Sequence, residues 1–156
     1  MKGYDSLKIR KAQISDLKYV QKLINDYAKK EEMIPRSLNE LYETVRDFVV
    51  YEEHGNIYAV CALHIMWEDL AEIRSLAVNK HYQKRGIGKK LVQKCLKEAR
   101  ALGIKKVFAL TYCPEFFKKL GFIDIDKASL PQKIWGDCLR CPRFPECNEH
   151  AVIKYL

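Results

Sequence analysis

The segment Gln83-Lys84-Arg85-Gly86-Ile87-Gly88 constrains the fold more than any other part of the chain. It separates a strand pattern over residues 71–78 from a helical pattern over residues 88–102. A helix that begins directly after a strand presents unpaired backbone N–H groups and the positive end of its dipole, and glycines let an anion approach that backbone closely. The sequence therefore predicts a strand–loop–helix unit that binds a phosphate group.

The surroundings of this loop are strongly basic. No acidic residue lies between Glu72 and Glu98, and the chain as a whole carries a formal net charge of +8. The basic side chains in this interval are Arg74, Lys80, Lys84, Arg85, Lys89, Lys90, Lys94 and Lys97. Such a field suits a phosphorylated cofactor or a nucleic acid. Because no aromatic series is interleaved with the basic residues, a nucleic acid is the less favoured partner.

Two other phosphate-binding loops are excluded by residue identity. A dinucleotide-binding loop requires a third glycine at position 91, which is Leu91. A Walker loop requires four residues between its glycines and a Ser or Thr after its lysine, and neither is present. A tight turn in front of a basic surface helix is the alternative interpretation of Gly86-Ile87-Gly88.

The first half of the chain predicts a strand, two helices and a hairpin. Residues 7–12 form a weak strand pattern, and Ser15 is expected to cap a helix with Leu17, Val20, Leu23, Ile24 and Tyr27 on one face. A second helix follows Pro35, with Ser37 and Glu40 spaced as a capping box and with apolar residues at Leu38, Leu41, Val45 and Phe48. From Phe48 the pattern changes to a β-rich run that extends to Tyr51, and the turn at residues 54–56 joins it to a second strand over residues 57–67.

The second half alternates helices and strands. The helix from Gly88 is expected to end at Gly103 and to face inward through Leu91, Val92, Cys95, Leu96, Ala99 and Leu102. A buried strand over residues 107–110, a short helix opened by Pro114, a strand after Phe122 and a last strand near residues 151–155 follow. The fold class is α/β (α+β), a mixed central sheet flanked by helices. Residues 1–128 form the core, and residues 129–156 form a cysteine-containing extension packed on the same domain.

No stretch approaches the roughly 20 apolar residues of a membrane span, and the first ten residues lack the apolar block of a secretory signal. We therefore expect a cytoplasmic protein without a membrane partner, and a homodimer is compatible with the sequence. Cys61, Cys95 and Cys113 lie in apolar strand, helix or loop contexts, which favours reduced thiols in or near the core.

The basic loop resembles the (Gln/Arg)-x-x-Gly-x-(Gly/Ala) acetyl-CoA motif of the GNAT superfamily of acetyltransferases. Residues 116–122, Phe-Phe-Lys-Lys-Leu-Gly-Phe, resemble the helix and Gly-Phe corner that follow in that superfamily. The resemblance implies acetyl-CoA as co-substrate, with its pyrophosphate on the backbone amides of Gln83, Lys84, Arg85, Gly86, Ile87, Gly88 and Lys89. It also implies that Leu76, Ala77 and Val78 pair with the pantetheine arm, as an added strand does at a sheet edge.

Acetylation of an amine requires removal of a proton from the amine and stabilisation of the leaving thiolate. The resemblance implies Glu72 as the base, and the alternative is a strand carboxylate paired with Arg74. The usual acid of the superfamily is a tyrosine where this chain has Phe117. Tyr112 is the candidate substitute, and a packing role for Tyr112, a water, or no acid at all remain open because a thiolate leaves readily near neutral pH.

Residues 33–41 and 71–78 resemble the acetyltransferase domain of N-acetylglutamate synthases, here in a short standalone form. The resemblance implies that Arg36 binds a carboxylate of L-glutamate, with Arg74 as a second cation, and that the product serves arginine biosynthesis. A guanidinium fits a carboxylate through two hydrogen bonds. The alternatives are a surface position for Arg36, another small amine or a protein N-terminus as acceptor, or a non-catalytic acyl-CoA-binding sensor.

Cys138, Cys141, Cys147 and His150 have the spacing C-x2-C-x5-C-x2-H near the end of the chain. These side chains form a candidate set of four ligands for a structural zinc ion. A reduced surface loop and a Cys138–Cys141 redox pair are the alternatives.

Overall fold

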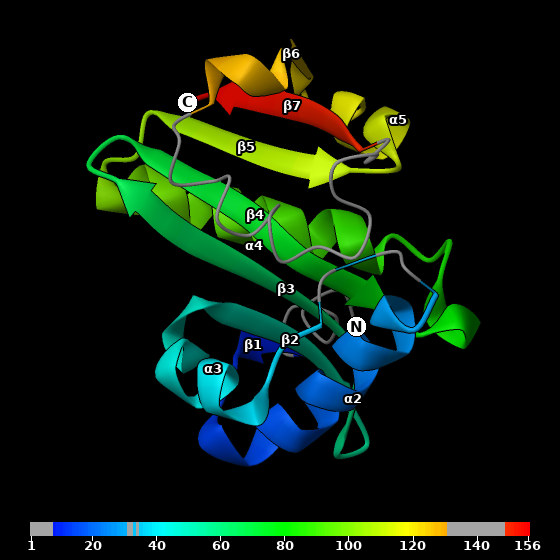
Figure 1. The fold of residues 1–156 in the computed structure, drawn as a ribbon. Coiled ribbons are helices and arrows are strands. Elements are labelled where there is room, and N and C mark those ends of the chain that lie inside the picture. Colours follow the sequence, from blue (N-terminus) through cyan, green and yellow to red (C-terminus); the bar gives the residue numbers. More distant parts are fainter. Residues whose placement is uncertain (1–7, 31–32, 34, 131–148) are drawn as a thin grey trace.

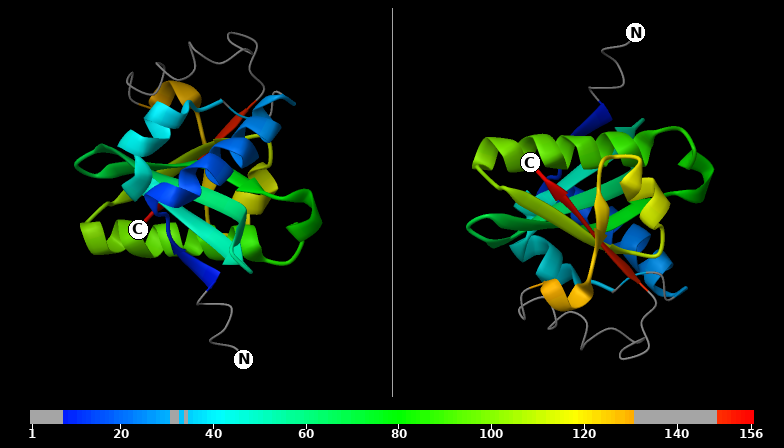
Figure 2. Two further views of the ribbon diagram at one scale, coloured as in Figure 1. Left: turned by 90° about the horizontal axis from the view of Figure 1, so that it is seen from below. Right: turned by 90° about the horizontal axis from the view of Figure 1, so that it is seen from above.

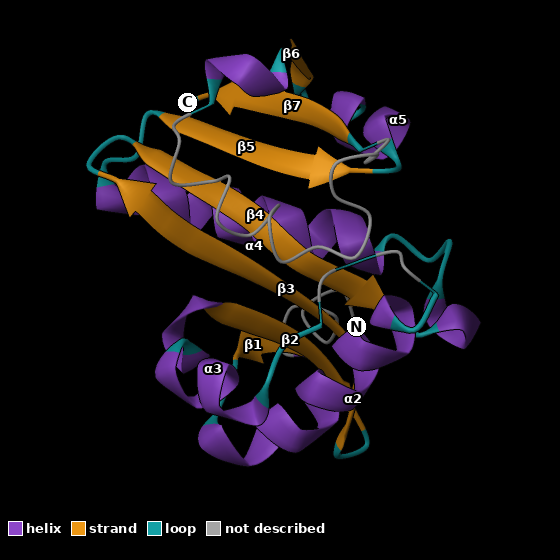
Figure 3. Cartoon of the chain, viewed as in Figure 1, coloured by secondary structure: helices purple, strands orange, loops and turns teal. Residues whose placement is uncertain are grey.

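The computed structural model describes residues 8–30, 33, 35–130 and 149–156. Within these residues, seven strands form one mixed sheet (Figures 1 and 3). Their order is β1-β2-β3-β4-β5-β7-β6. β4 and β5 pair in parallel, whereas all other neighbours are antiparallel. The strands are β1 (Ile9–Lys11), β2 (Phe48–Glu53), β3 (Asn56–Trp67), β4 (Leu70–Val78), β5 (Lys106–Thr111), β6 (Ile123–Ile125) and β7 (His150–Tyr155).

Helices cover both faces of this sheet. Helices α2 (Leu17–Ala28) and α3 (Leu38–Glu43) lie on one face and α4 (Ile87–Leu102) lies on the other, as Figure 2 shows in edge views. The short helix α5 (Pro114–Lys118) adds Phe117 to the core beneath α4. Because successive side chains of a strand point to opposite faces, β3 supplies Val60 and Ala62 to the α2 side and Cys61 and Leu63 to the α4 side. None of the helices in the described ranges is long and apolar enough to cross a membrane.

The helix that follows the basic loop matches its prediction except at one end. Its buried residues include Leu91, Val92, Cys95, Leu96 and Ala99, and Gly103 ends it in the left-handed conformation at φ 87°. The inward position predicted for Leu102 is wrong, because this side chain is 61% exposed. The chain leaves the helix at Gly103, and Ile104 takes the buried place instead.

The first helix does not begin as predicted. Ser15 lies inside a 3-10 turn, Ile14–Asp16, and α2 begins only at Leu17, so the capping role predicted for Ser15 is wrong. Asp16 organises this corner because its carboxylate accepts hydrogen bonds from the Gln13 N–H (2.7 Å) and from both terminal nitrogens of Arg10 (2.7 and 3.0 Å). The Arg10 guanidinium holds the pKa of Asp16 below its ordinary value.

The second helix has the predicted beginning but is shorter. The Ser37 hydroxyl accepts the Glu40 N–H at 3.1 Å, as expected for a helix cap. The helix ends at Glu43, so its predicted continuation through Val45 is wrong, whereas the change to a strand predicted at Phe48 is confirmed. Phe48 begins β2, which is hydrogen-bonded between β1 and β3 and is buried from Phe48 to Tyr51. Strand pairing with distant residues overrides the local helical spacing here.

The first three cysteines are free thiols, as predicted, but the core or near-core position predicted for Cys113 is wrong. Cys61 on β3 and Cys95 on α4 are buried free thiols, with their sulfur atoms 3.9 Å apart. The hydrogen bond to Cys95 and burial raise the pKa of the Cys61 thiol well above its ordinary value. Cys113 is an exposed free thiol after β5.

Candidate active site

The basic loop connects β4 to α4 and presents a helix N-terminus. Gly86 is the residue before α4 and adopts φ 81°, a left-handed conformation that favours glycine. The first hydrogen bond within the helix runs from the Lys90 N–H to the Gly86 carbonyl at 3.1 Å. The N–H groups of Ile87, Gly88 and Lys89 therefore precede the helical ladder and are placed to bind an anion.

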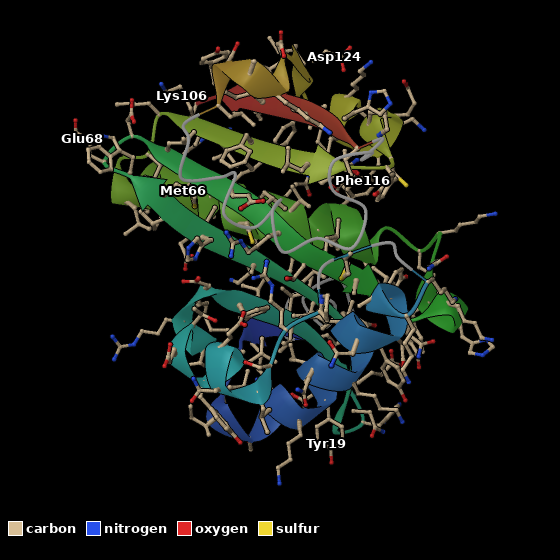
Figure 4. The ribbon with its side chains drawn as sticks, viewed as in Figure 1. Tyr19, Met66, Glu68, Lys106, Phe116 and Asp124 are labelled. Carbon is tan, nitrogen blue, oxygen red and sulfur yellow. The ribbon has the colours of Figure 1, made fainter. Side chains whose placement is uncertain are left out.

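Gly88 lies where β4, α4 and α5 meet. A Cβ at this position contacts the Phe116 ring at 3.5 Å and Val78 at 3.7 Å, which are ordinary packing distances. Figure 4 shows Phe116 at the end of the sheet where β4 and β5 separate, far from Met66 near the opposite end. Because Gly88 has no side chain, its backbone stays accessible between the Phe116 ring and Val78.

Side-chain contacts hold the loop in place. The Gln83 amide donates hydrogen bonds to the Tyr27 hydroxyl (2.7 Å) and to the Val78 carbonyl (3.2 Å), and the Tyr27 hydroxyl donates to the same carbonyl. The Arg85 guanidinium lies over the Tyr82 ring, 4.7 Å from its centroid. Tyr82 in turn stacks on Tyr58 at 4.0 Å. The backbone that offers the N–H groups is thus fixed by α2 and by an aromatic stack.

β4 and β5 diverge next to this loop. Their pairing comprises only Leu70↔Lys106, Ala71↔Val107 and Glu72↔Phe108, after which β4 continues to Val78 beside β3 alone (Figure 1). A bulge at Ser75, with φ 56°, shifts the β3–β4 register at this point. In the described part of the chain, the β5-facing edge of Leu76, Ala77 and Val78 therefore has no strand partner, and an extended ligand can pair with it.

Glu72 is the last β4 residue paired with β5 and lies where the gap opens. Its residue exposure is only 8%, and its Oε1 accepts hydrogen bonds from Arg74 Nε (3.1 Å) and Nη2 (2.8 Å). The pairing with Arg74 that the sequence left open is therefore present. It fixes the orientation of a carboxylate beside the gap, and it directs the Arg74 guanidinium toward Glu72 and the Met66 sulfur rather than into the basic loop.

Arg36 lies between α2 and α3, on the same face of the sheet as Glu72. Its backbone is held by two side chains of α2, with its N–H on Asn25 Oδ1 (3.2 Å) and its carbonyl accepting from Gln21 Nε2 (3.3 Å). Its side chain is 10% exposed and lies 3.5 Å from the carboxylate of Glu40. A freely solvated position at the helix entry is thereby ruled out.

The tyrosine position of the superfamily holds an apolar side chain in this structure. Phe117 is buried and packs edge-on against Phe122 at 5.2 Å. Tyr112 follows the last residue of β5, at the same edge of the sheet as the loop after β4, because the two strands are parallel. A role for Tyr112 as the acid remains a prediction.

The sequence did not indicate one further polar pair on this face. His64 on β3 is the register partner of Glu72, and its Nδ1 lies 2.7 Å from Asp47 Oδ2 in the 3-10 turn before β2. Three separate segments meet here, so no local spacing could have revealed the pair.

The predicted zinc site lies largely outside the described residues. His150 is exposed at the start of β7, and Cys138, Cys141 and Cys147 lie outside the described residues. Within the described ranges, no group of three or more His, Cys, Asp or Glu side chains is arranged to hold a metal ion.

Known proteins resemble this chain along most of its length. The model of the acetyltransferase (GNAT) family matches residues 16–122. An uncharacterised N-acetyltransferase of Chlorobaculum tepidum is 38% identical over 148 residues, covering 95% of this chain and 96% of the relative. An amino-acid acetyltransferase of Mycobacterium tuberculosis is 35% identical over 135 residues, covering 85% of this chain and 77% of the relative. N-acetylglutamate synthase from Neisseria gonorrhoeae, complexed with coenzyme A and N-acetyl-glutamate, aligns with a TM-score of 0.86 and 29% identity over 95% of this chain and 34% of that chain.

Proposed function

The chain belongs to the acetyltransferase (GNAT) family, and from this membership we propose that it transfers the acetyl group of acetyl-CoA to the α-amine of an amino acid, with L-glutamate as the acceptor. One observation carries the proposal. The edge of β4 that lacks a partner after Glu72 leads directly into the helix N-terminus at Gly86, so a single extended ligand with a diphosphate fits both.

The loop and the strand edge divide the binding of acetyl-CoA between them. The diphosphate is held by backbone N–H groups from Gln83 to Lys89, with Lys84, Arg85 and Lys89 supplying positive charge around it. The pantetheine arm pairs with Leu76, Ala77 and Val78 and carries the thioester toward Glu72. The Neisseria enzyme is complexed with coenzyme A, which supports a coenzyme A ligand for this chain.

Glu72 acts as the base in the proposed mechanism. It takes a proton from the acceptor ammonium group, and the resulting amine attacks the thioester carbon. The C–N bond forms as the C–S bond breaks, and the second proton of the nitrogen passes to the leaving thiolate through Tyr112 or water. For an ammonium acceptor, the products are the acetylated amine, coenzyme A as a thiol and one released proton.

The choice of glutamate rests on two cations at the acceptor face. Arg36 and Arg74 both come from this face, and Arg36 is fixed by α2 through Gln21 and Asn25. A doubly negative acceptor needs such groups, and a guanidinium binds a carboxylate through two hydrogen bonds. The name of the Mycobacterium relative and the N-acetyl-glutamate in the Neisseria complex support this choice. The product, N-acetylglutamate, would serve arginine biosynthesis.

We expect Arg36→Ala to raise the KM for L-glutamate about 10- to 100-fold, since losing a charged hydrogen-bonded contact costs roughly 1.5–3 kcal/mol. The Kd for acetyl-CoA should stay within about twofold of wild type. Steady-state kinetics with glutamate as the varied substrate provide the measurement.

Two matched variants separate acceptor binding from loss of local structure. Glu40→Gln removes the ion pair with Arg36 but keeps the guanidinium, so its KM should remain close to that of the wild type. Arg100→Ala removes an exposed arginine in the last turn of α4, on the opposite face of the sheet, and should also have little effect. An unchanged KM in Arg36→Ala would show that Arg36 does not bind the acceptor.

A further inference from the structure

We propose that the His64–Asp47 pair is the proton outlet of the active site: His64 receives the proton that Glu72 has taken from the acceptor and passes it to solvent. The inference rests on the proposed function, because it concerns the one proton that each transfer to an ammonium acceptor releases. His64 acts through Glu72, so it is a relay and positioning residue.

The sheet places His64 beside Glu72. The register from Ala62↔Arg74 through Leu63↔Ile73 to His64↔Glu72 is regular, and directly opposite residues of an antiparallel pair project from the same face. Their Cβ atoms lie about 4.5–5.5 Å apart. A glutamate and a histidine at this separation reach each other directly or through one water.

Asp47 orients the imidazole. Its Oδ2 lies 2.7 Å from His64 Nδ1, which assigns the Nδ1 proton to this hydrogen bond and leaves Nε2 as the nitrogen that can accept a further proton. Charged groups near the ring include Asp47 from the 3-10 turn and Glu72 and Arg74 from β4.

Exposure increases in the direction of the proposed transfer. The side chains of Glu72 and Arg74 are 10% and 16% exposed, whereas those of His64 and Asp47 are 31% and 24% exposed. Glu72 is thus the buried end of the path and His64 is the end that meets water. The acceptor itself lies over Glu72 during turnover and restricts direct access of water to this carboxylate.

The chemistry requires such a path. The ammonium acceptor carries three N–H protons; one stays on the amide, one leaves with the thiol of coenzyme A and one must reach the solvent. Glu72 has to lose the proton it accepted before the next turnover, and it is held by the Arg74 guanidinium. His64 Nε2 takes that proton, and water or buffer removes it from the imidazolium.

The test compares His64→Ala with the wild type at saturating acetyl-CoA and glutamate in dilute buffer near neutral pH. We expect kcat to fall roughly 10- to 100-fold, less than the roughly 100- to 10,000-fold that a group in direct proton transfer contributes, because His64 acts through Glu72; the KM for glutamate should change less than about threefold. Added imidazole should restore kcat of His64→Ala several-fold and leave the wild type unchanged. A purely structural role for His64 does not predict this rescue.

Three further variants separate proton relay by His64 from its hydrogen bond with Asp47. His64→Gln keeps a donor for Asp47 but cannot relay a proton, so its kcat should be as low as that of His64→Ala. Asp47→Asn should reduce kcat less, because the imidazole remains. His54→Asn changes an exposed histidine in the β2–β3 turn and should behave as the wild type.

The proposed role of His64 in proton release would be contradicted by a kcat for His64→Ala equal to that of the wild type, or by a loss of kcat that imidazole does not restore. These results are distinct from failure of the proposed function, in which the wild type itself forms no acetylated amino acid in the same assay.

Discussion

Replacing Glu72 by Gln is expected to lower kcat about 100- to 10,000-fold near neutral pH, the range that a positioned general base contributes. Gln keeps the shape of the side chain and an oxygen that can accept from Arg74, but it cannot take a proton. The Kd for acetyl-CoA should remain near its wild-type value, because the loop and the free edge of β4 are untouched. The loss should become smaller at high pH, where solvent has already deprotonated the amine.

Two controls separate loss of the base from loss of the folded structure. Glu68→Gln alters an exposed carboxylate in the β3–β4 turn and should leave kcat unchanged, while calorimetric binding of coenzyme A shows whether Glu72→Gln is folded. Glu72→Gln breaks a buried ion pair, which is costly and can prevent folding. If Glu72→Gln does not bind coenzyme A, the test uses Glu72→Asp, whose shorter side chain keeps the negative charge but holds it farther from the acceptor. Turnover unchanged across the pH range would mean that Glu72 is structural.

The second large effect is expected at the start of α4. Gly88→Val should weaken acetyl-CoA binding about 100-fold, because the added methyl groups obstruct the diphosphate from N–H groups whose charged hydrogen bonds contribute roughly 1.5–3 kcal/mol each. Gly86→Val should have a comparable effect for another reason: a β-branched residue at φ 81° is strained and displaces the loop. Isothermal titration with coenzyme A gives both values.

Controls distinguish these two reasons. Gly86→Asn tolerates the left-handed conformation and adds its side chain where no atom lies within 4 Å, so it should bind more tightly than Gly86→Val. Ala101→Val places the same β-branched residue at the exposed far end of α4 and should leave the Kd unchanged. Wild-type affinity in folded Gly86→Val and Gly88→Val would remove the loop from the coenzyme site.

Local signals in the sequence predicted most of the elements. Gly103 ends α4 as expected, and the turn at His54-Gly55-Asn56 joins β2 and β3, because these residues act through their own backbone conformation. The failures occur where distant contacts decide. Val45 has helical spacing from Leu41 but lies in the 3-10 turn that leads into β2, beyond the end of α3.

The candidate site shows the same division. The loop at residues 83–88 could be predicted because its glycines and basic residues are contiguous. The sequence offered the Glu72–Arg74 pair only as one of two alternatives, since two residues of one strand can also point to separate partners. The His64–Asp47 pair could not be predicted, because it depends on the β3–β4 register and on where the turn before β2 places Asp47. Insertion of β7 between β5 and β6 is likewise a long-range outcome.

The most direct test of the account is to incubate the purified protein with acetyl-CoA and single acceptors, and to identify products by mass while coenzyme A release is followed. The acceptors are L-glutamate, L-glutamine, L-aspartate, a polyamine and a peptide with a free N-terminus. The account predicts acetylated glutamate with the highest kcat/KM and stoichiometric release of coenzyme A. Acetylation of only the polyamine or the peptide would contradict the amino-acid acceptor, and coenzyme binding without release from any mixture would contradict acetyl transfer itself.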